Sequence, residues 1–477
     1  MKKNLRKFDT KIQHLKYKVR REVARYAWRD ELLEKITEIP KIIVPGKEST
    51  TRCCIYKERA IINEQIKVAM GGNRQNPNVI EVIGIACDEC PVGGYEVTDT
   101  CRGCLAHRCE EACPKGAITF DTEQKAHIDK SKCVECGACS RVCPYNAITV
   151  QKRPCWNACK VGAISMTEDR IAYIDNDACI SCGACVYQCP FGAILDKSFI
   201  LDVISLLKES HGNTDTHVYA VVAPSISSQF QYAKLGQVLA GIEALGFYKI
   251  EEAALGADMV AFAEAKELTE KGFLMSSCCP AFVAYVHKKF PQFAENISHS
   301  LSPVATISKY IKEQDEKAKV VFIGPCTAKK MEFQKPEVRP YIDSVITFEE
   351  LQSLFDSRDI DITMLPEAAL NRASYYGRIF AKSCGLSSAI AQGLIEQNAE
   401  NFSFQAVPCD GIAECKVALL KAAKNRLDGN FVEGMACVGG CIGGAGCLTH
   451  AERNKLILEK YSKESEWKTI EEALDAL

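Results

Sequence analysis

A cysteine run that occurs twice constrains this chain more than any other feature of its sequence. The pattern C-x-x-C-x-x-C-x-x-x-C-P begins at Cys133 and again at Cys179. Thiolates at this spacing suit one small iron–sulfur cage, because each of them must reach a different iron of the same cluster. A structural zinc site is the alternative, and the complete, repeated run argues against it. The chain is therefore expected to hold cubane iron–sulfur clusters.

The total of 27 cysteines in a chain of 477 residues also argues against disulfides. The number is odd, and residues 1–7 are followed by no apolar stretch that would mark an export signal. No apolar run approaches the ~20 residues of a membrane span. A net charge of -2 argues against nucleic acid as a main partner. We expect a cytoplasmic protein in a reducing, anaerobic cell interior.

Two incomplete copies of the run accompany the complete ones. A looser copy lies between Cys101 and Cys113, and a truncated copy holds Cys155 and Cys159. Each copy is followed by a small apolar turn of the form Gly/Asn-Ala-Ile. The segment from 81 to 196 resembles a duplicated bacterial two-cluster ferredoxin, which implies small α+β domains that carry 4Fe–4S clusters. His107 lies inside the looser copy, where we interpret it as a surface residue rather than a ligand.

The ferredoxin resemblance implies a crossed ligand pattern, in which three cysteines of a run hold one cluster and the fourth binds its neighbour. The implied groups are Cys101, Cys104, Cys109 with Cys143; Cys133, Cys136, Cys139 with Cys113; and Cys179, Cys182, Cys185 with Cys159. Cys155 and Cys189 then need two more thiolates, which Cys87 and Cys90 could supply for a fourth cluster. The alternative is that the truncated copy has lost its cluster.

Residues 1 to about 40 have the pattern of a basic amphipathic helix. Apolar residues recur at helical spacing from Leu15 to Leu32, with Lys16, Arg20 and other cations between them. Two interpretations stay open: a helix that packs on its own protein, or a docking site for an acidic electron-transfer protein. A second helix is expected over 53–62, where Cys53 and Cys54 fit buried free thiols as well as ligands.

From about residue 200 the sequence changes to an α/β texture. Residues 217–223 and 319–323 are predicted strands, and 235–245 and 257–268 are predicted helices. Strands that alternate with helices indicate parallel sheets covered on both faces. We divide the chain into a helical N-terminal segment (1–80), iron–sulfur domains (81–196), an α/β domain (197–455) and a helical tail (456–477).

Three cysteine segments of the α/β domain resemble the signature segments of the iron-only (FeFe) hydrogenases. They are Ser276-Ser277-Cys278-Cys279-Pro280, Gly324-Pro325-Cys326-Thr327-Ala328-Lys329-Lys330-Met331-Glu332, and Glu433-Gly434-Met435-Ala436-Cys437 continuing to Gly439-Gly440-Cys441-Ile442-Gly443-Gly444. The resemblance covers 217–450 and implies two lobes around an H-cluster, a 4Fe–4S cluster tied to a two-iron unit with carbon monoxide, cyanide and a bridging dithiolate. It implies four cubane ligands, Cys279, Cys326, Cys437 and Cys441, and Cys441 would also bridge to the two-iron unit.

The same resemblance assigns further roles. Cys278 matches the family's proton-transfer thiol, and a relay to the surface is expected through Glu264, Ser298 and Glu267. The alternative for both glutamates is an exposed helix face. Lys329 matches a lysine that donates to a cyanide ligand, and Glu332 is expected to pair with it. The residues expected to line the cofactor are Ala223, Pro224, Ser225 and Met435.

Several positions depart from the best-known branch of the family and look like its group B branch. Gly324 replaces a methionine, Phe282 a tryptophan and Val304 a glutamine. Neighbours of metal ligands tune potential and rate, so these changes bear on catalytic bias more than on the reaction. No family role carries over to the remaining cysteines of the domain, which we interpret as buried thiols: Cys384, Cys409, Cys415 and Cys447.

The resemblance implies reversible interconversion of protons and electrons with molecular hydrogen. A low-potential carrier such as ferredoxin would supply electrons, and maturation proteins would install the two-iron unit. A hydrogen sensor is one alternative, but sensor branches carry an added signalling module and the sequence shows none. A non-catalytic iron–sulfur electron-transfer or assembly protein is another, but it would not need Cys278, Lys329 and Glu332 together.

Overall fold

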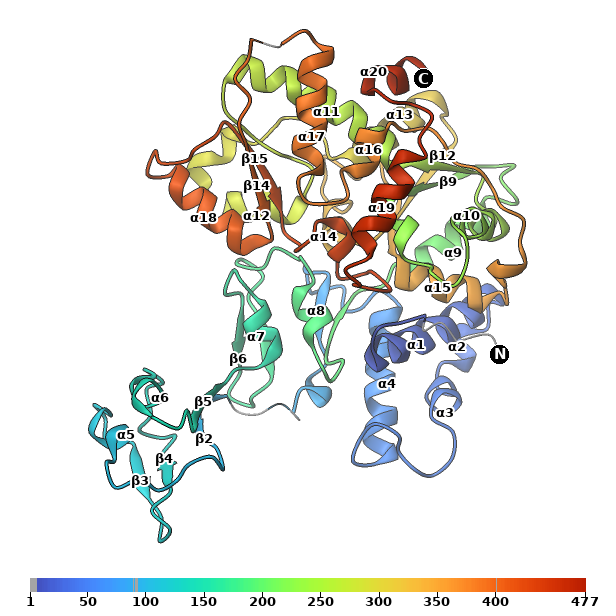
Figure 1. Cartoon of the computed structure of the whole chain (residues 1–477). Helices are drawn as coiled ribbons and strands as arrows, with labels where there is room; N and C mark the ends of the chain where they lie inside the picture. The colour runs from blue at the N-terminus through green and yellow to red at the C-terminus, as the bar shows by residue number, and fades with distance from the viewer. Residues whose placement is uncertain (1–6, 89, 91–92, 400) are drawn as a thin grey trace.

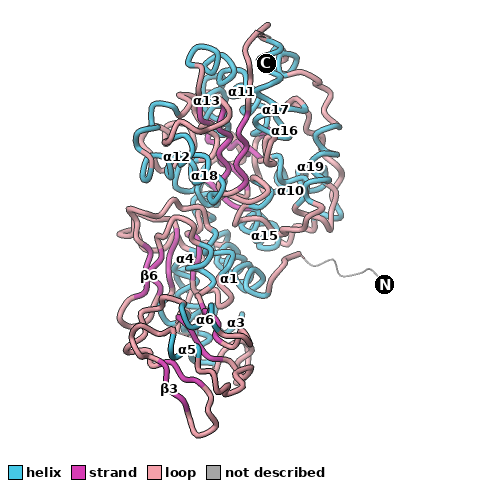
Figure 2. The backbone as a smooth tube through the Cα atoms, turned by 60° about the vertical axis from the view of Figure 1, so that its left-hand side comes forward, coloured by secondary structure: helices cyan, strands magenta, loops and turns pink. Residues whose placement is uncertain are grey.

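The computed structural model describes residues 7–88, 90, 93–399 and 401–477, so the first six residues considered as a possible signal lie outside it. Figure 1 shows an α/β body, a helical N-terminal unit beside it, an inner cysteine-rich unit against it, and a small head that protrudes from the rest. Figure 2, turned by 60°, again places the head at the far end from the body. No helix within the described residues is long and apolar enough to cross a membrane.

The head (residues 94–151) contains the looser run and the first complete run. Its strands form two antiparallel pairs, β2 with β5 and β3 with β4. The bounds of its elements are β2 (Gly94–Val97), α5 (Arg108–Glu111), β3 (Ile118–Phe120), β4 (Ala126–Ile128), α6 (Ala138–Val142) and β5 (Ile148–Gln151). The Ala-Ile turn after each run is buried at Ala117, Ile118, Ala147 and Ile148, which gives this small unit an apolar centre beside its cysteines.

The inner unit (residues 80–88, 90 and 152–196) repeats this plan around the truncated run and the second complete run. Its antiparallel pairs are β6 with β7 and β1 with β8. The bounds are β1 (Ile80–Val82), η1 (Gly84–Ala86), α7 (Pro154–Ala158), β6 (Ile164–Met166), β7 (Ala172–Ile174), α8 (Ala184–Gln188) and β8 (Ile194–Asp196). Unlike the head, this unit packs directly on the α/β body (Figure 1).

The N-terminal unit has four helices: α1 (Lys11–Trp28), α2 (Leu32–Lys35), α3 (Ile39–Ile43) and α4 (Ile55–Ala69). The prediction of one helix over residues 1 to about 40 is wrong, because the chain turns after Trp28 and Asp30 takes a left-handed φ of 61°. Lys16 and Arg20 are 6% and 4% exposed and form internal ion pairs. The structure therefore supports a helix packed on its own protein.

The α/β body contains two parallel sheets. One has the order β10-β9-β12-β13 and the other β11-β15-β14. The bounds are β9 (His217–Val222), β10 (Lys249–Glu252), β11 (Leu274–Met275), β12 (Ala318–Gly324), β13 (Ser344–Thr347), β14 (Ala406–Asp410) and β15 (Phe431–Met435). The two strands expected from the sequence, β9 and β12, are confirmed and pair with each other. The two-lobe arrangement around a cofactor stays a prediction.

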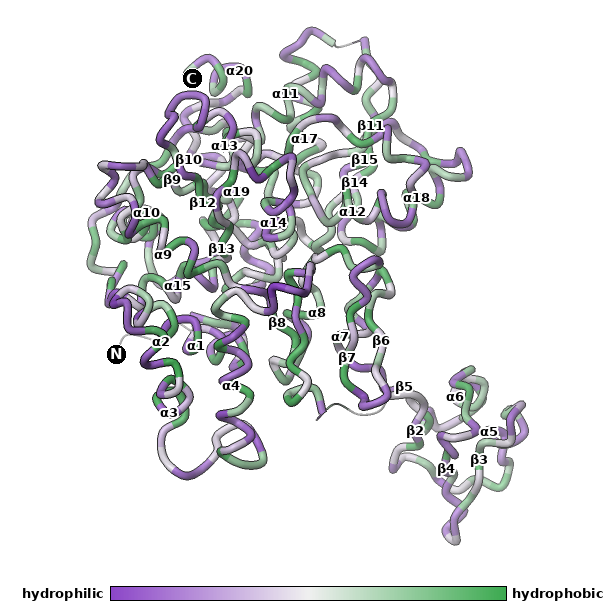
Figure 3. The backbone as a smooth tube through the Cα atoms, turned by 180° about the vertical axis from the view of Figure 1, so that it is seen from behind, coloured by the Kyte–Doolittle hydropathy of each residue, from purple (hydrophilic) through white to green (hydrophobic). Residues whose placement is uncertain are grey.

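Helices cover these sheets, as expected for parallel strands that are apolar on both faces. Figure 3 shows the hydrophobic colour concentrated along β9, β12 and β15. The helix bounds are α9 (Ile200–Glu209), α10 (Leu235–Ala244), α11 (Ala253–Lys271), α12 (Pro280–Lys289), α13 (Pro303–Gln314), α14 (Thr327–Glu332), α15 (Phe348–Ser357), α16 (Tyr375–Ile379), α17 (Gly385–Glu396), α18 (Ile412–Ala422), α19 (Asn454–Lys463) and α20 (Ile470–Asp475), with short η2 (Pro224–Ser228), η3 (Pro291–Asn296), η4 (Ile362–Met364) and η5 (Cys441–Gly443). Leu458 and Ile470 are fully buried, so the C-terminal helices belong to the body.

Candidate metal centre

The predicted catalytic segments all follow the carboxyl ends of parallel strands. Residue 223 follows β9, Cys278 and Cys279 follow β11, Cys326 follows β12, and Cys437 follows β15. Cys279 and Cys326 also stand at the N-caps of α12 and α14. Carboxyl ends of parallel strands meet at one edge of a sheet, where ligand sites of α/β proteins are found. Two separate sheets thus contribute residues to one site.

The thiols of Cys279, Cys326, Cys437 and Cys441 influence one another electrostatically. Burial, with a contribution from the nearby Cys279, raises the pKa of Cys326 to about 11. Burial, with contributions from Cys326 and Cys279, raises the pKa of Cys441 to about 12. Burial also raises the pKa of Cys437 well above its ordinary value, with added contributions from Cys326, Cys279 and Cys441. Four acidic groups in one buried place disfavour ionisation unless a cation compensates for them.

This donor set fits an iron–sulfur cluster. Soft thiolates are the ligands that such clusters use, and positive iron would compensate for the charges that burial and mutual repulsion disfavour. Glycines allow the loop of Cys441 to pack closely against neighbouring backbone. Gly440 has a φ of 84°, and a Cβ there would lie 2.8 Å from the backbone of Lys382. A Cβ on Gly444 would lie 2.6 Å from the carbonyl oxygen of Pro325, next to Cys326.

The residues that the sequence assigns to the cofactor lining are largely buried. Lys329 donates to Glu332 at 2.6 Å, and both are buried, so the expected pairing is confirmed. The hydroxyl of Ser225 is fully buried and has no hydrogen-bond partner among the described residues. Met435 is 3% exposed at the end of β15, and Ala223 is 5% exposed at the start of η2, beside Pro224. An unpaired buried hydroxyl is a group that a ligand can satisfy.

The residues of the predicted proton relay follow one another in space from Cys278 toward the protein surface. Glu264 is 0% exposed and contributes to the raised pKa of Cys278. Its Oε1 accepts hydrogen bonds from the amide and hydroxyl of Ser277, whereas its Oε2 has none among the described residues. Ser298 lies within electrostatic reach of Glu264 and donates to Glu267 at 2.8 Å. The exposed-helix alternative is therefore wrong for Glu264.

The two glutamates differ in their acidity. Burial raises the pKa of Glu264 to about 7. Burial also acts on Glu267, but hydrogen bonds from Lys271, Ser298 and the amide of His299 outweigh it and lower the pKa below its ordinary value. Glu267 is only partly buried. The inner carboxyl can thus exchange a proton near neutral pH, and the outer one stays ionised at the protein surface.

The cysteines of the head lie in two groups. Cys104 and Cys143 act on the pKa of Cys109, and Cys101 packs in the same apolar cluster. The second group surrounds a small cavity that is lined by Cys113, Cys133, Cys136 and Cys139. These are the crossed groups that the ferredoxin resemblance implies, and their role as ligands stays a prediction. His107 stacks on Phe120 with ring centroids 3.7 Å apart and is partly buried rather than fully at the surface.

The inner unit also has two groups of cysteines. Cys179, Cys182 and Cys159 all raise the pKa of Cys185, which burial already places well above its ordinary value. The other group lines a second small cavity and contains Cys87, Cys90, Cys155 and Cys189. The structure thus brings together the four cysteines considered for a fourth cluster, whereas Glu89 and Pro91 between them lie outside the described residues.

The inner unit meets the metal centre directly. Cys182 contributes to the raised pKa of Cys437, and Cys279 to that of Cys182. Thr327, the residue after Cys326, donates to the carbonyl of Ser181 at 2.8 Å. A cavity of about 710 Å³ between the two parts is lined by Cys159, Cys182 and Cys437. The second complete run is therefore the one nearest to the predicted catalytic cubane.

One prediction about the other cysteines is wrong: Cys384 is exposed, because it caps α17. Cys53 and Cys54 precede α4 and are also exposed, which contradicts the buried-thiol alternative and leaves the ligand alternative untested. Cys409, Cys415 and Cys447 are buried as expected. Glu433 is fully buried, raises the pKa of Cys278, and accepts hydrogen bonds from Cys384 and Ser387. An acidic residue within the apolar strand β15 is the signal that could have revealed it.

Comparisons with known proteins identify similar segments. Residues 216–445 match the family model for the iron-only hydrogenase large subunit, C-terminal domain. Residues 100–147 match a 4Fe-4S dicluster domain, and 172–195 match a 4Fe-4S binding domain.

Among curated proteins, iron hydrogenase 1 of Clostridium pasteurianum is 29% identical over 295 residues, which cover 50% of this chain and 51% of the relative. A cytosolic Fe-S cluster assembly factor, NAR1 of Botryotinia fuckeliana, is 33% identical over 142 residues, 25% of each chain. The chain spans about half the length of the first of these relatives. A solved variant of FeFe-hydrogenase HydA1 from Chlamydomonas reinhardtii aligns with a TM-score of 0.47 at 20% identity, over 58% of this chain and 93% of that one.

Proposed function

We propose that this chain, whose residues 216–445 belong to the iron-only hydrogenase large-subunit family and follow ferredoxin-type 4Fe-4S domains, catalyses the reversible reaction 2 H⁺ + 2 e⁻ to H₂. The observation that carries the proposal is the convergence of four partly buried cysteines, Cys278 and the Lys329–Glu332 pair at the carboxyl ends of strands from two sheets. Its setting would be the reducing cytoplasm of an anaerobic cell.

In this proposal Cys279, Cys326, Cys437 and Cys441 hold the cubane of an H-cluster, and Cys441 also holds the two-iron unit. When bound, that unit supplies an open metal position and a bridging base at which hydrogen is formed or split. The ammonium of Lys329, which pairs with Glu332 at 2.6 Å, would donate a hydrogen bond to an anionic diatomic ligand of that unit. Ser225 and Met435 are buried and would line the same space and keep bulk water out of it.

Protons would move between Cys278 and the surface through Glu264, Ser298 and Glu267. A carboxyl whose pKa is about 7 is well suited to pass protons in both directions near neutral pH. The Ser298 hydroxyl can accept a proton from one side while it donates on the other, as its bond to Glu267 requires.

Electrons would enter at the head from a low-potential carrier such as ferredoxin, and pass through up to four cubanes to the catalytic one. The cysteine groups support this order, because Cys155 of one inner group acts on Cys185 of the next, and Cys182 acts on Cys437 of the catalytic group. Each transfer moves one electron, and two electrons reach the metal centre for each hydrogen molecule.

Infrared spectroscopy of the anaerobically matured chain tests this proposal. Carbon monoxide and cyanide bands that shift when hydrogen is added are the expected result, and Lys329→Met is expected to move the cyanide bands. A protein with full cubanes and proven maturation machinery that shows no such bands would contradict the enzymatic function.

That negative result would favour the non-catalytic iron–sulfur function, which the similarity to NAR1 over a quarter of the chain supports. Bands that respond to hydrogen in a protein with negligible turnover would instead favour a sensor. The cubane count of the head and inner unit follows from iron analysis of the same sample.

A further inference from the structure

We propose that Gln13, on helix α1, is a positioning residue for the loop that carries Cys441, and that Cys447 extends its contact to the backbone of Cys441. This role rests on the proposed function in one respect: Cys441 is taken as the ligand that joins the two parts of the catalytic cofactor. The contacts that follow involve residues far apart in the sequence, and none of them belongs to the proposed proton or electron path.

Gln13 uses both ends of its side-chain amide. Its Oε1 accepts the backbone N–H groups of Asp9 and Thr10 at 3.1 Å, which closes the capping box at the start of α1. Its Nε2 donates to the carbonyl oxygen of Cys447 at 3.0 Å. Gln13 is 4% exposed, so water cannot readily replace this bond if it is lost. One side chain thus joins the first turn of α1 to the loop.

Cys447 brings this contact to Cys441. The Cys447 thiol is completely buried, and its Sγ lies 3.4 Å from the carbonyl oxygen of Ile442 and 3.8 Å from that of Cys441. These are distances at which a thiol donates a weak hydrogen bond. The backbone of Cys441 is therefore two contacts away from Gln13.

His450 holds the other end of the same loop. Its backbone N–H donates to Asp9 Oδ2 at 2.7 Å, and its Nε2 lies 3.0 Å from the carbonyl oxygen of Gly444. Its ring packs on Tyr187 of the inner unit, with ring centroids 4.0 Å apart. Residues 441–450 are thus held between α1 on one side and the inner unit on the other.

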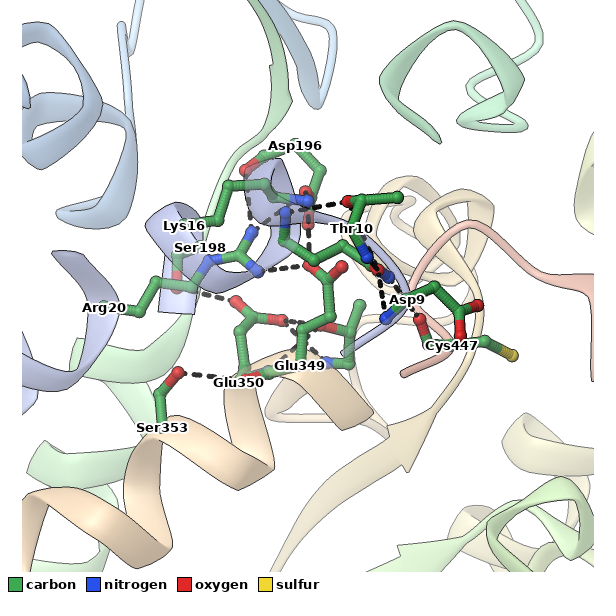
Figure 4. A network of polar contacts seen from close by, with 12 residues as sticks. Asp9, Thr10, Lys16, Arg20, Asp196, Ser198, Glu349, Glu350, Ser353 and Cys447 are labelled. Carbon is green, nitrogen blue, oxygen red and sulfur yellow. Dashed lines mark hydrogen bonds and ion pairs between the residues drawn. The ribbon is translucent and has the colours of Figure 1, made fainter. Parts of the chain in front are cut away.

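Buried charges fix α1 in turn (Figure 4). Lys16 lies 2.7 Å from Glu349, and Arg20 lies 2.9 Å from Asp196 and 2.8 Å from Glu349. Asp196 also pairs with Lys330 at 2.8 Å, beside Lys329. Asp196 ends the inner unit and Glu349 lies in α15 of the body, so buried ion pairs tie α1 to both parts of the molecule.

Gln13→Glu tests the proposal with little disturbance of the helix. A glutamate at this position still closes the capping box, but it replaces the Nε2 donor by an oxygen that cannot donate to Cys447. Gln237→Glu is the control for the capping box and for the added charge, because Gln237 also closes a capping box and donates through Nε2 to a backbone carbonyl, that of Thr363 at 2.9 Å, at a partly exposed position.

Hydrogen exchange is measured on the full chain made without maturation proteins. Amides of residues 439–450 are expected to exchange about tenfold faster in Gln13→Glu, the scale for loss of one hydrogen bond, and at the wild-type rate in Gln237→Glu. The midpoint potential of the cubane at Cys279, followed by electron paramagnetic resonance, is expected to shift in Gln13→Glu alone. Cys447→Ala is a second variant, with smaller acceleration expected.

Equal exchange of residues 439–450 in wild type, Gln13→Glu and Cys447→Ala would overturn the proposal. Absence of the catalytic cubane from a well-made sample would instead overturn the proposed function, since exchange can still be read without that cluster. Faster exchange throughout the chain would mean that Gln13 acts on global stability, which also contradicts a positioning role.

Discussion

The head and the inner unit carry the same cysteine run in opposite surroundings. Val134 and Ile180 occupy the same place in their runs, directly after the first cysteine, yet Val134 is 58% exposed and Ile180 is 4% exposed. Cys136 is exposed, whereas burial raises the pKa of its counterpart Cys182 to about 12. The difference comes from the α/β body, which packs on the inner unit through the Ile180 cluster with Phe282 and Tyr285.

The repeated cysteine run therefore determines the local fold of each unit, but it does not determine whether that unit is buried against the body or exposed. Each run has a glycine with positive φ at the N-cap of its helix: Gly137 before α6 and Gly183 before α8. The same bend of the chain is expected where both runs surround a cluster of the same size. In the inner unit a Cβ on Gly183 would lie 2.5 Å from Thr327 of the body, and in the head a Cβ on Gly137 would meet Tyr95 instead. The inner unit is thus part of the metal centre, and the head is a separate attachment.

Replacing one cysteine in each run gives the largest expected contrast. Cys182→Ser is expected to lower dye-driven hydrogen evolution about 100-fold or more, because it removes or displaces the cubane nearest to Cys437. Cys136→Ser is expected to leave the dye-driven rate near that of wild type, because a small dye can reach the inner unit without the head. Equal losses in the two variants would show that the head is as integral as the inner unit.

The charges that anchor the inner unit give the next largest effect. Arg20→Met removes one of the buried cations that neutralise Asp196 and Glu349, while Lys16 and Lys330 remain beside them. The change is expected to lower the free energy of unfolding by about 3 kcal/mol, the low end for a broken buried ion pair. Lys67→Met removes the exposed pair with Glu64 and is expected to cost about 1 kcal/mol or less. Anaerobic urea unfolding measures both, and similar values would contradict the buried network.

Val134 and Ile180 offer the most direct test of packing. Ile180→Ala opens a cavity at the junction with the body and is expected to cost about 2–5 kcal/mol. Val134→Ala removes a side chain that faces solvent and is expected to change stability by less than about 0.5 kcal/mol. Thermal unfolding of the two variants gives the comparison, and a destabilised Val134→Ala would mean that the head packs on something else.

The smallest expected effect concerns a cation that the body contributes to the inner unit. Lys288 of α12 donates to the carbonyl of Cys179 at 2.7 Å. Lys288→Met is expected to lower the reduction potential of the cubane proposed at Cys179 by something on the order of tens of millivolts. The reason is that the nearby positive charge of Lys288 stabilises the reduced form of that cubane. Lys132→Met in the head, where the side chain is 60% exposed, should shift its cubane less. Redox titration followed by electron paramagnetic resonance distinguishes the two.

Much of the site could be predicted because its chemistry is local. The spacing of Cys133 to Cys143 is set by the size of one cluster, and the Ala-Ile turns mark where each run returns to the apolar centre. The Lys329–Glu332 pair spans one helical turn, so its partners are adjacent in sequence. The parallel strands β9 and β12 were recognisable because most of their residues are apolar and buried.

Contacts between distant segments escaped the sequence for an equally physical reason. The cations of α1 have the pattern of a solvated face, and nothing near them in sequence shows that Asp196 and Glu349 will neutralise them. Glu433 was missed and Cys384 was wrongly expected to be buried, because their environment is made by α17 folding onto β15.

By itself the sequence indicated which cysteines are candidate cluster ligands, since cluster geometry constrains the spacing of thiols along a few residues of chain. It also determined the alternation of strands and helices that makes the body. Tertiary structure alone decided which repeat is buried at the metal centre, which carboxyl is held near neutral pKa, and which helix supports the Cys441 loop. Those properties depend on burial and on charges brought together across hundreds of residues, and no local pattern encodes either.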